Sequence, residues 1–165
     1  MPRRSTKPAP TVSAFSAGLR LLAGRAHSRL EMVRKLSRRG YGGEEVGTAV
    51  TRLRELGYLD DAAFAEGHVR RRSSSRGPMA LSAELGARGV DREVAEAALD
   101  RLSPDIELLG ARRLADRLAG NTRYASYREL LHSVGAKLIR RGFSIEVVRK
   151  ACDALWAGTT GEPRA

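Results

Sequence analysis

The sequence predicts an all-α protein, built from three tandem three-helix repeats that form an elongated, curved helical array. Three observations support this fold class. One phrase recurs three times in the 165-residue chain, as LSRRGYGGEEVGTAVTRL, LGARGVDREVAEAALDRL and LIRRGFSIEVVRKACDAL. Glycine stands at the same place in each phrase. No segment shows the strict apolar–polar alternation of a β-strand.

The three phrases begin at Leu36, Leu85 and Leu138, so they are 49 and 53 residues apart. A period of this size is typical of stacked supersecondary units. The aligned columns are Leu36, Leu85 and Leu138; Arg39, Arg88 and Arg141; Gly40, Gly89 and Gly142; Tyr41, Val90 and Phe143; Val46, Ala95 and Val148; Ala49, Ala98 and Ala151; Val50, Leu99 and Cys152; and Leu53, Leu102 and Leu155.

The columns indicate a helix end, a short turn and a second helix. Glycine is common just past a helix C-terminus, where the chain adopts a left-handed conformation. A basic residue before it suits the negative end of the helix dipole. The apolar columns after it recur at spacings of three and four, which is the pattern of one helix face.

Helix-start signals place the other elements. Ser28 and Glu31 fit a capping box, and Gly77–Pro78 and Ser103–Pro104 put proline at the first position of a helix. With one further helix before each phrase, every repeat has three helices. The predicted division is a disordered tail at 1–13, repeats at 14–57, 58–102 and 103–157, and a second disordered tail at 158–165.

The formal net charge of the chain is +11, and +8 of it falls within residues 14–157. The folded part is therefore basic, which favours a polyanion or an acidic protein as partner. Cys152 is the only cysteine, so no internal disulfide can form. There is no apolar run long enough to cross a membrane and no secretory signal, so we expect a cytoplasmic protein without a membrane partner. We also expect a monomer, since nothing in the sequence suggests a coiled coil or an obligate dimer.

The sequence offers little for catalysis, and we expect no enzyme activity and no cofactor. His27, His68 and His132 share no metal-site spacing with one another or with acids, and there is no phosphate-binding loop or nucleophile elbow. Asp60 and Asp61 are paired carboxylates, but their position predicts an N-cap and a first-turn acid of the following helix. Phe64 is predicted in the core.

Clusters of arginine are the better candidates for function. A consecutive run such as Arg70–Arg72 spreads over most of a helical turn, so its members cannot all be buried. A single arginine is more often part of a solvated face, but the whole set favours contact with phosphates or an acidic partner. The candidate contact residues are Arg34, Arg38, Arg39, Arg70, Arg71, Arg72, Arg140 and Arg141.

The stretch GYLDDAAFAEGHVRRR, followed by GPMALSAELGARGV, resembles the RecX family of RecA regulators. The matching positions are Gly57 to Asp61, Phe64–Ala65, Arg70 to Arg72, Gly77–Pro78, Glu84–Leu85 and Gly89–Val90. The block RAHSRLEMVRKLSRRGY resembles the entry to the family's first glycine turn, with Met32 in place of the usual leucine. Arg88 replaces the common lysine before Gly89, and the third repeat matches more weakly.

The resemblance implies a regulator without catalysis that binds the filament of RecA on single-stranded DNA. Members of the family lodge in the filament groove and suppress strand exchange, ATP hydrolysis and coprotease activity, which would connect this chain to DNA repair, recombination and the SOS response. Two alternatives stay open. One is a protein that binds single-stranded or double-stranded DNA directly, since each glycine turn joins two helices as in a helix-turn-helix. The other is a helical scaffold without a nucleic-acid role.

Overall fold

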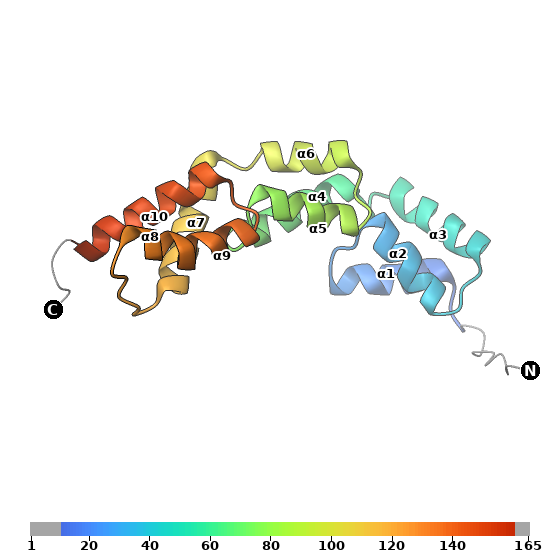
Figure 1. Ribbon diagram of the computed structural model, residues 1–165. Coiled ribbons are helices and arrows are strands. Elements are labelled where there is room, and N and C mark those ends of the chain that lie inside the picture. Colours follow the sequence, from blue (N-terminus) through green and yellow to red (C-terminus); the bar gives the residue numbers. More distant parts are fainter. Residues whose placement is uncertain (1–10, 161–165) are drawn as a thin grey trace, which may run out of the picture.

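The protein is described by a computed structural model over residues 11–160, and all regular secondary structure in that range is helical. Figure 1 shows three groups of helices that follow one another in an arch, with the first described helix and the last in its two end groups. The predicted fold class is therefore confirmed. The predicted tails fall largely outside the described residues, at 1–10 and 161–165.

Each repeat contributes three helices. The first contains α1 (Ala14–Gly24), α2 (Arg29–Arg38) and α3 (Gly43–Glu55). The second contains α4 (Asp61–Arg72), α5 (Pro78–Ala87) and α6 (Arg92–Asp100). The third contains α7 (Pro104–Ala119), a middle helix made of α8 (Tyr127–Leu130), the π-helical turn η1 (Leu131–Gly135) and α9 (Ala136–Arg140), and α10 (Ile145–Thr160).

Two boundaries differ from the prediction. Val12 and Ser13, assigned from the sequence to a disordered tail, are held in the fold, because the Val12 carbonyl accepts from the Tyr41 hydroxyl at 2.8 Å and the Ser13 hydroxyl accepts from the Ser16 backbone N–H at 3.2 Å. Helix α10 continues to Thr160, so residues 158–160, assigned from the sequence to a disordered tail, are helical. The glycine at 158 does not end the helix, because one glycine lowers helix propensity by only about 1 kcal/mol.

The helix-start signals are confirmed in their main features. The Asp60 carboxylate Oδ1 accepts hydrogen bonds from the backbone N–H groups of Ala62 and Ala63, at 2.8 and 3.2 Å. Pro78 and Pro104 open their helices as predicted. Ser28 caps α2, since its hydroxyl accepts from the Glu31 backbone N–H at 3.2 Å.

The three glycine turns adopt the left-handed conformation. Gly40, Gly89 and Gly142 have φ angles of 96°, 76° and 85°. A residue with a β-carbon is strained there by about 1–2 kcal/mol, which explains the glycine column.

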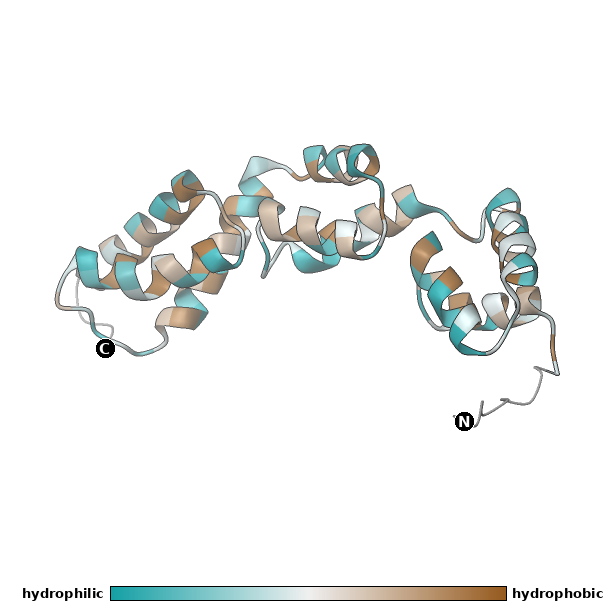
Figure 2. Cartoon of the chain, turned by 45° about the vertical axis from the view of Figure 1, so that its right-hand side comes forward, coloured by the Kyte–Doolittle hydropathy of each residue, from teal (hydrophilic) through white to brown (hydrophobic). Residues whose placement is uncertain are grey.

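Each repeat buries its own hydrophobic core. Leu36, Leu85 and Leu138 are fully buried, each in a different one of three separate clusters. Figure 2 likewise shows hydrophobic residues recurring within each group of helices. Stability thus comes from three small cores and from the contacts that join neighbouring repeats.

The middle helices of the repeats follow one another in a row, from α8–α9 through α5 to α2 (Figure 1). In this row the N-terminus of α5 lies at the turn after α9, and the N-terminus of α2 lies at the turn after α5. The row therefore has one polarity along the whole arch. These two contacts bring the turns after α9 and α5, with Arg141 and Arg88, against the neighbouring repeats.

Candidate functional site

The junction between the first two repeats is made by side chains. The Ser28 hydroxyl donates a hydrogen bond to the backbone carbonyl of Arg88 at 2.6 Å. The Arg88 guanidinium pairs with the Glu31 carboxylate at 2.6 Å. Leu30 lies over the Gly89 turn so closely that a β-carbon on Gly89 would stand 2.4 Å from Leu30 Cδ2. This contact requires glycine at residue 89 for space as well as for conformation.

The junction between the second and third repeats is made by the backbone. The Gly77 N–H donates to the Arg141 carbonyl at 2.9 Å, and the Met79 N–H donates to the Gly142 carbonyl at 3.2 Å. A β-carbon on Gly77 would lie 2.3 Å from the Gly142 carbonyl oxygen. Two backbones approach each other directly here, so side chains are excluded from the contact.

Helix α7 strengthens the second junction. A β-carbon on Gly110 would stand 2.6 Å from the Ser73 carbonyl oxygen, so α7 packs closely against the end of α4. The Arg117 guanidinium donates to the Ser74 carbonyl at 3.3 Å. These contacts bring the α4 end, α7 and the α9 end together.

Basic residues from three elements gather at this second junction. They come from the end of α4, from α7, and from the end of α9. We call them the junction arginines, and they are Arg70, Arg71, Arg117, Arg140 and Arg141. Arg70, Arg71, Arg117 and Arg140 are exposed. The junction therefore offers a multivalent basic surface, which suits phosphates or carboxylates.

Arg72 differs from its two neighbours in the triplet. Its guanidinium lies 3.2 Å from the Glu84 carboxylate, which also contacts Arg76 at 3.0 Å and the buried His68 ring at 2.8 Å. Burial would raise the pKa of Glu84, but the hydrogen bonds from Arg72, His68 and Arg76 outweigh burial and lower it to about 2. Glu84 thus stays ionised and holds the end of α4 against α5.

The predicted arginines of the first repeat lie apart from the junction. Arg34, Arg38 and Arg39 are exposed on the C-terminal half of α2 and its cap. The first repeat contacts the second through the other end of α2, at Ser28 to Glu31. The structure therefore forms two basic surfaces where the sequence suggested one set.

The family-motif residues have structural contacts. Asp61 Oδ1 accepts from the backbone N–H of Arg29 at 2.7 Å, so it joins the second repeat to the first. Phe64 is buried, as predicted, and its ring stacks on His68 with centroids 6.2 Å apart. Gly77 and Pro78 form the second junction and the first position of α5.

One of the junction arginines, Arg117, lay outside the eight candidate contact residues. It belongs to a basic cluster that is visible in the sequence, Arg112, Arg113 and Arg117. Its contact with Ser74 joins residues 43 apart in the chain, so the sequence alone did not connect this cluster with the α4 end.

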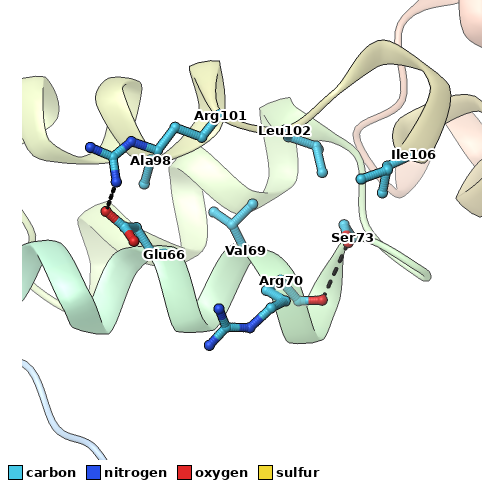
Figure 3. Close-up of a pocket in the computed structure, with 8 residues that line it drawn as sticks. All are labelled: Glu66, Val69, Arg70, Ser73, Ala98, Arg101, Leu102 and Ile106. Atoms are coloured by element: carbon cyan, nitrogen blue, oxygen red, sulfur yellow. Dashed lines mark hydrogen bonds and ion pairs between the residues drawn. The ribbon is translucent and has the colours of Figure 1, made fainter.

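An apolar groove lies beside the junction, between α4 and α6 (Figure 3). It has a volume of about 270 Å³ and is lined by Val69, Ala98, Leu102 and the exposed Ile106. The Arg101 side chain spans one edge to pair with Glu66, and the Arg70 guanidinium points away from the groove (Figure 3).

The described residues 11–160 contain no cluster of three or more metal-ligating side chains. Within the same range, none of the helices has the length and apolar character to span a membrane. What the chain presents is an arch of helical repeats with a basic junction beside an apolar groove. The fold defines a helical-repeat protein.

The chain belongs to the RecX family. Residues 14–53 match the model of the first three-helix domain of RecX, and residues 60–99 match the second. A regulatory protein RecX from Chromohalobacter salexigens is 39% identical over 142 residues, which cover 86% of this chain and 91% of that protein. Another, from Stenotrophomonas maltophilia strain R551-3, is 40% identical over 134 residues and covers 81% of each chain.

Solved structures support the fold. The crystal structure of RecX from Lactobacillus salivarius superposes with a TM-score of 0.76 at 24% identity, over 87% of this chain and 95% of that one. A crystal structure of regulatory protein RecX gives the same TM-score at 26% identity, over 85% of this chain and 71% of that one. The curated relatives are named as regulatory proteins, which agrees with a binding role.

Proposed function

We propose that this protein binds the filament of RecA on single-stranded DNA and inhibits its strand exchange, ATPase and coprotease activities. The observation that carries the proposal is membership of the RecX family, at 39% identity over nearly the whole length of a relative. Family members are regulators of RecA, and the role in recombination, repair and the SOS response follows from that activity. The proposed location is the cytoplasm, where such filaments form.

The junction gives this proposal a physical basis. A nucleoprotein filament presents both phosphates and protein side chains. The junction arginines supply guanidinium groups for phosphates or carboxylates, and the neighbouring groove offers apolar surface for a protein side chain. We propose the junction arginines as the main contact, with Arg34, Arg38 and Arg39 as a second contact further along the arch.

Direct reading of DNA by the helix-turn-helix-like pairs is the alternative. The helix after each glycine turn would then enter a groove with its N-terminal residues first. Here those first turns carry acids, at Glu44 and Glu45 in α3, Glu93 in α6 and Glu146 in α10. Carboxylates in these positions repel phosphates, so the geometry favours the filament over naked duplex DNA.

The test is the ATPase activity of RecA on single-stranded DNA, titrated with this protein at fixed moderate salt. We expect a fall at substoichiometric amounts, which a basic protein of equal charge does not reproduce. The alternative, direct DNA binding, is tested by measuring binding to naked DNA without RecA at several salt concentrations. Direct binding should occur without RecA and weaken steeply as the salt concentration rises. An unchanged ATPase with tight, salt-sensitive DNA binding would overturn the proposal.

A further inference from the structure

The row of middle helices ends in two complementary surfaces. Inside the chain, the N-terminus of one middle helix contacts the glycine turn that follows the next middle helix, and this occurs twice. At one end of the arch lies the N-terminus of the helix that spans residues 127–140. At the other end lies the turn after α2, at Arg39 and Gly40 (Figure 1).

The turn at Arg39–Gly40 has the same form as the two turns that are covered. Arg39, Arg88 and Arg141 have similar backbone angles, with φ between −90° and −83° and ψ between −6° and 5°. Among the described residues, no heavy atom lies within 4 Å of where a Gly40 β-carbon would stand, whereas Leu30 and Ala80 closely approach the equivalent points at Gly89 and Gly142. Arg39 is exposed.

The opposite end repeats the residues of the first junction. Ser126 caps its helix as Ser28 does, since each hydroxyl accepts from the backbone N–H of a glutamate three residues later at 3.2 Å. The Ser28 hydroxyl also donates to the Arg88 carbonyl, and the glutamate of that pair, Glu31, binds the Arg88 side chain. Glu129 Oε2 accepts from the Ala125 backbone N–H at 2.7 Å, so its other oxygen, Oε1, would make the contact with an arginine. Ser126 and Glu129 therefore offer the same hydroxyl and carboxylate groups that the first junction uses.

We propose that copies of this chain associate head to tail, with Ser126 and Glu129 of one copy docked on the Arg39–Gly40 turn of the next. The Ser126 hydroxyl donates to the Arg39 carbonyl, and the Glu129 carboxylate pairs with the Arg39 guanidinium. The contact continues an interface already present within the chain, and its Glu129–Arg39 pair is complementary in charge. The middle-helix row then runs unbroken from copy to copy, with C-terminal carbonyls facing N-terminal amides.

The new contact is weaker than the internal one. Arg128 takes the place of Leu30, so the apolar contact over the glycine is absent, and Ala14 takes the place of Asp61 at the start of the first helix. A dilute chain therefore stays monomeric, and association appears at high concentration. Because the two surfaces differ, the contact is open-ended and does not stop at a dimer.

Sedimentation velocity of the full chain alone tests this proposal. The measurement is made at low salt over protein concentrations from about 10 µM to about 1 mM, so that association with a Kd of about 1 mM is detected. We expect a sedimentation coefficient that rises steadily with concentration. R39E and E129R should each raise the apparent Kd at least about tenfold. R54E, an equal charge change at an exposed arginine of α3, should not.

Mixing the two variants gives the decisive result. In an equimolar mixture, each contact between an R39E chain and an E129R chain joins opposite charges at positions 39 and 129. In one orientation the two charges are exchanged, and in the other the native pair is kept. The mixture should therefore associate as the native chain does. A native chain that remains monomeric up to 1 mM, association that stops at a dimer, or an R39E variant no weaker than R54E would each overturn the proposal. Because RecA is absent, this outcome is independent of the function proposed above.

Discussion

The two junctions join equivalent parts of neighbouring repeats by different chemistry. At the first junction the contacts are made by the Ser28 hydroxyl, the Glu31 carboxylate and the Arg88 side chain. At the second, backbone groups of Gly77 and Gly142 meet directly. A side-chain contact can be adjusted by sequence and responds to pH and salt. A backbone contact tolerates little change, because any side chain at the glycine would separate the two repeats.

This difference matters for function because the junction arginines surround the second, backbone junction. A backbone contact there holds the helix segments that carry these arginines in fixed relative positions, which favours multivalent binding. The first junction attaches the repeat that carries Arg34, Arg38 and Arg39. We therefore expect substitutions at the second junction to have the larger effects.

The largest effect is expected for G142A. A β-carbon there would lie 2.3 Å from the Ala80 backbone nitrogen, and φ is 85°. The left-handed conformation and the steric clash together should cost about 3 kcal/mol of unfolding free energy. G40A is the matched control, because it has a similar φ but open space, and it should cost only about 1–2 kcal/mol. Urea unfolding of both variants measures the difference, and equal losses would show that the backbone contact adds no stability.

An intermediate effect is expected for E84Q, which removes the carboxylate that pairs with Arg72 and Arg76 and contacts His68. The loss at pH 7 should be about 2 kcal/mol, because hydrogen bonds to a charged group are lost. The pKa of Glu84 is lowered from 4.5 to about 2, so its contribution is fully present above pH 4.5 and is lost as the pH falls towards 2.

Acid unfolding followed by circular dichroism checks this pH dependence. The native chain should lose stability progressively between pH 4.5 and 2, and E84Q should lose less over that range. E96Q is the control, because Glu96 forms an exposed pair with Arg92 on α6. Identical acid profiles for E84Q and the native chain would contradict the assigned role of Glu84.

The smallest of these stability effects is expected for S28A. It removes an N-cap and also the hydrogen bond to the Arg88 carbonyl, for a total of about 2 kcal/mol or less. S126A removes only an N-cap in the dilute chain and should cost about 1 kcal/mol. Thermal unfolding at low protein concentration compares them. If S126A were as destabilising as S28A, the hydroxyl would contribute nothing to the first junction.

The fold was predictable from the sequence because its signals are local. The recurring glycines mark left-handed turns, the proline positions mark helix starts, and Leu36, Leu85 and Leu138 mark the three cores. The junctions were not predictable, because they join residues far apart in the chain. Asp61 reaches Arg29 across 32 residues, and Ser28 reaches Arg88 across 60.

The candidate site was predictable only in part for the same reason. Arg70, Arg71 and Arg72 are alike in sequence, but Glu84 on the next helix engages Arg72 and leaves its neighbours exposed. The local pattern shows that a basic run cannot be wholly buried. Which member is engaged depends on the packing of α5 against α4, and this follows from the tertiary structure.

The central claim is that this RecX-family chain acts on the RecA filament through the second junction. The most direct measurement compares inhibition of the RecA ATPase by R70E/R71E and by R52E/R54E, a pair of exposed arginines at the end of α3 with the same change in charge. The account predicts that R70E/R71E needs at least about tenfold more protein for half inhibition, whereas R52E/R54E stays close to the native chain. Equal losses from both variants would show that overall charge, and not the junction, determines the activity, and would contradict the account.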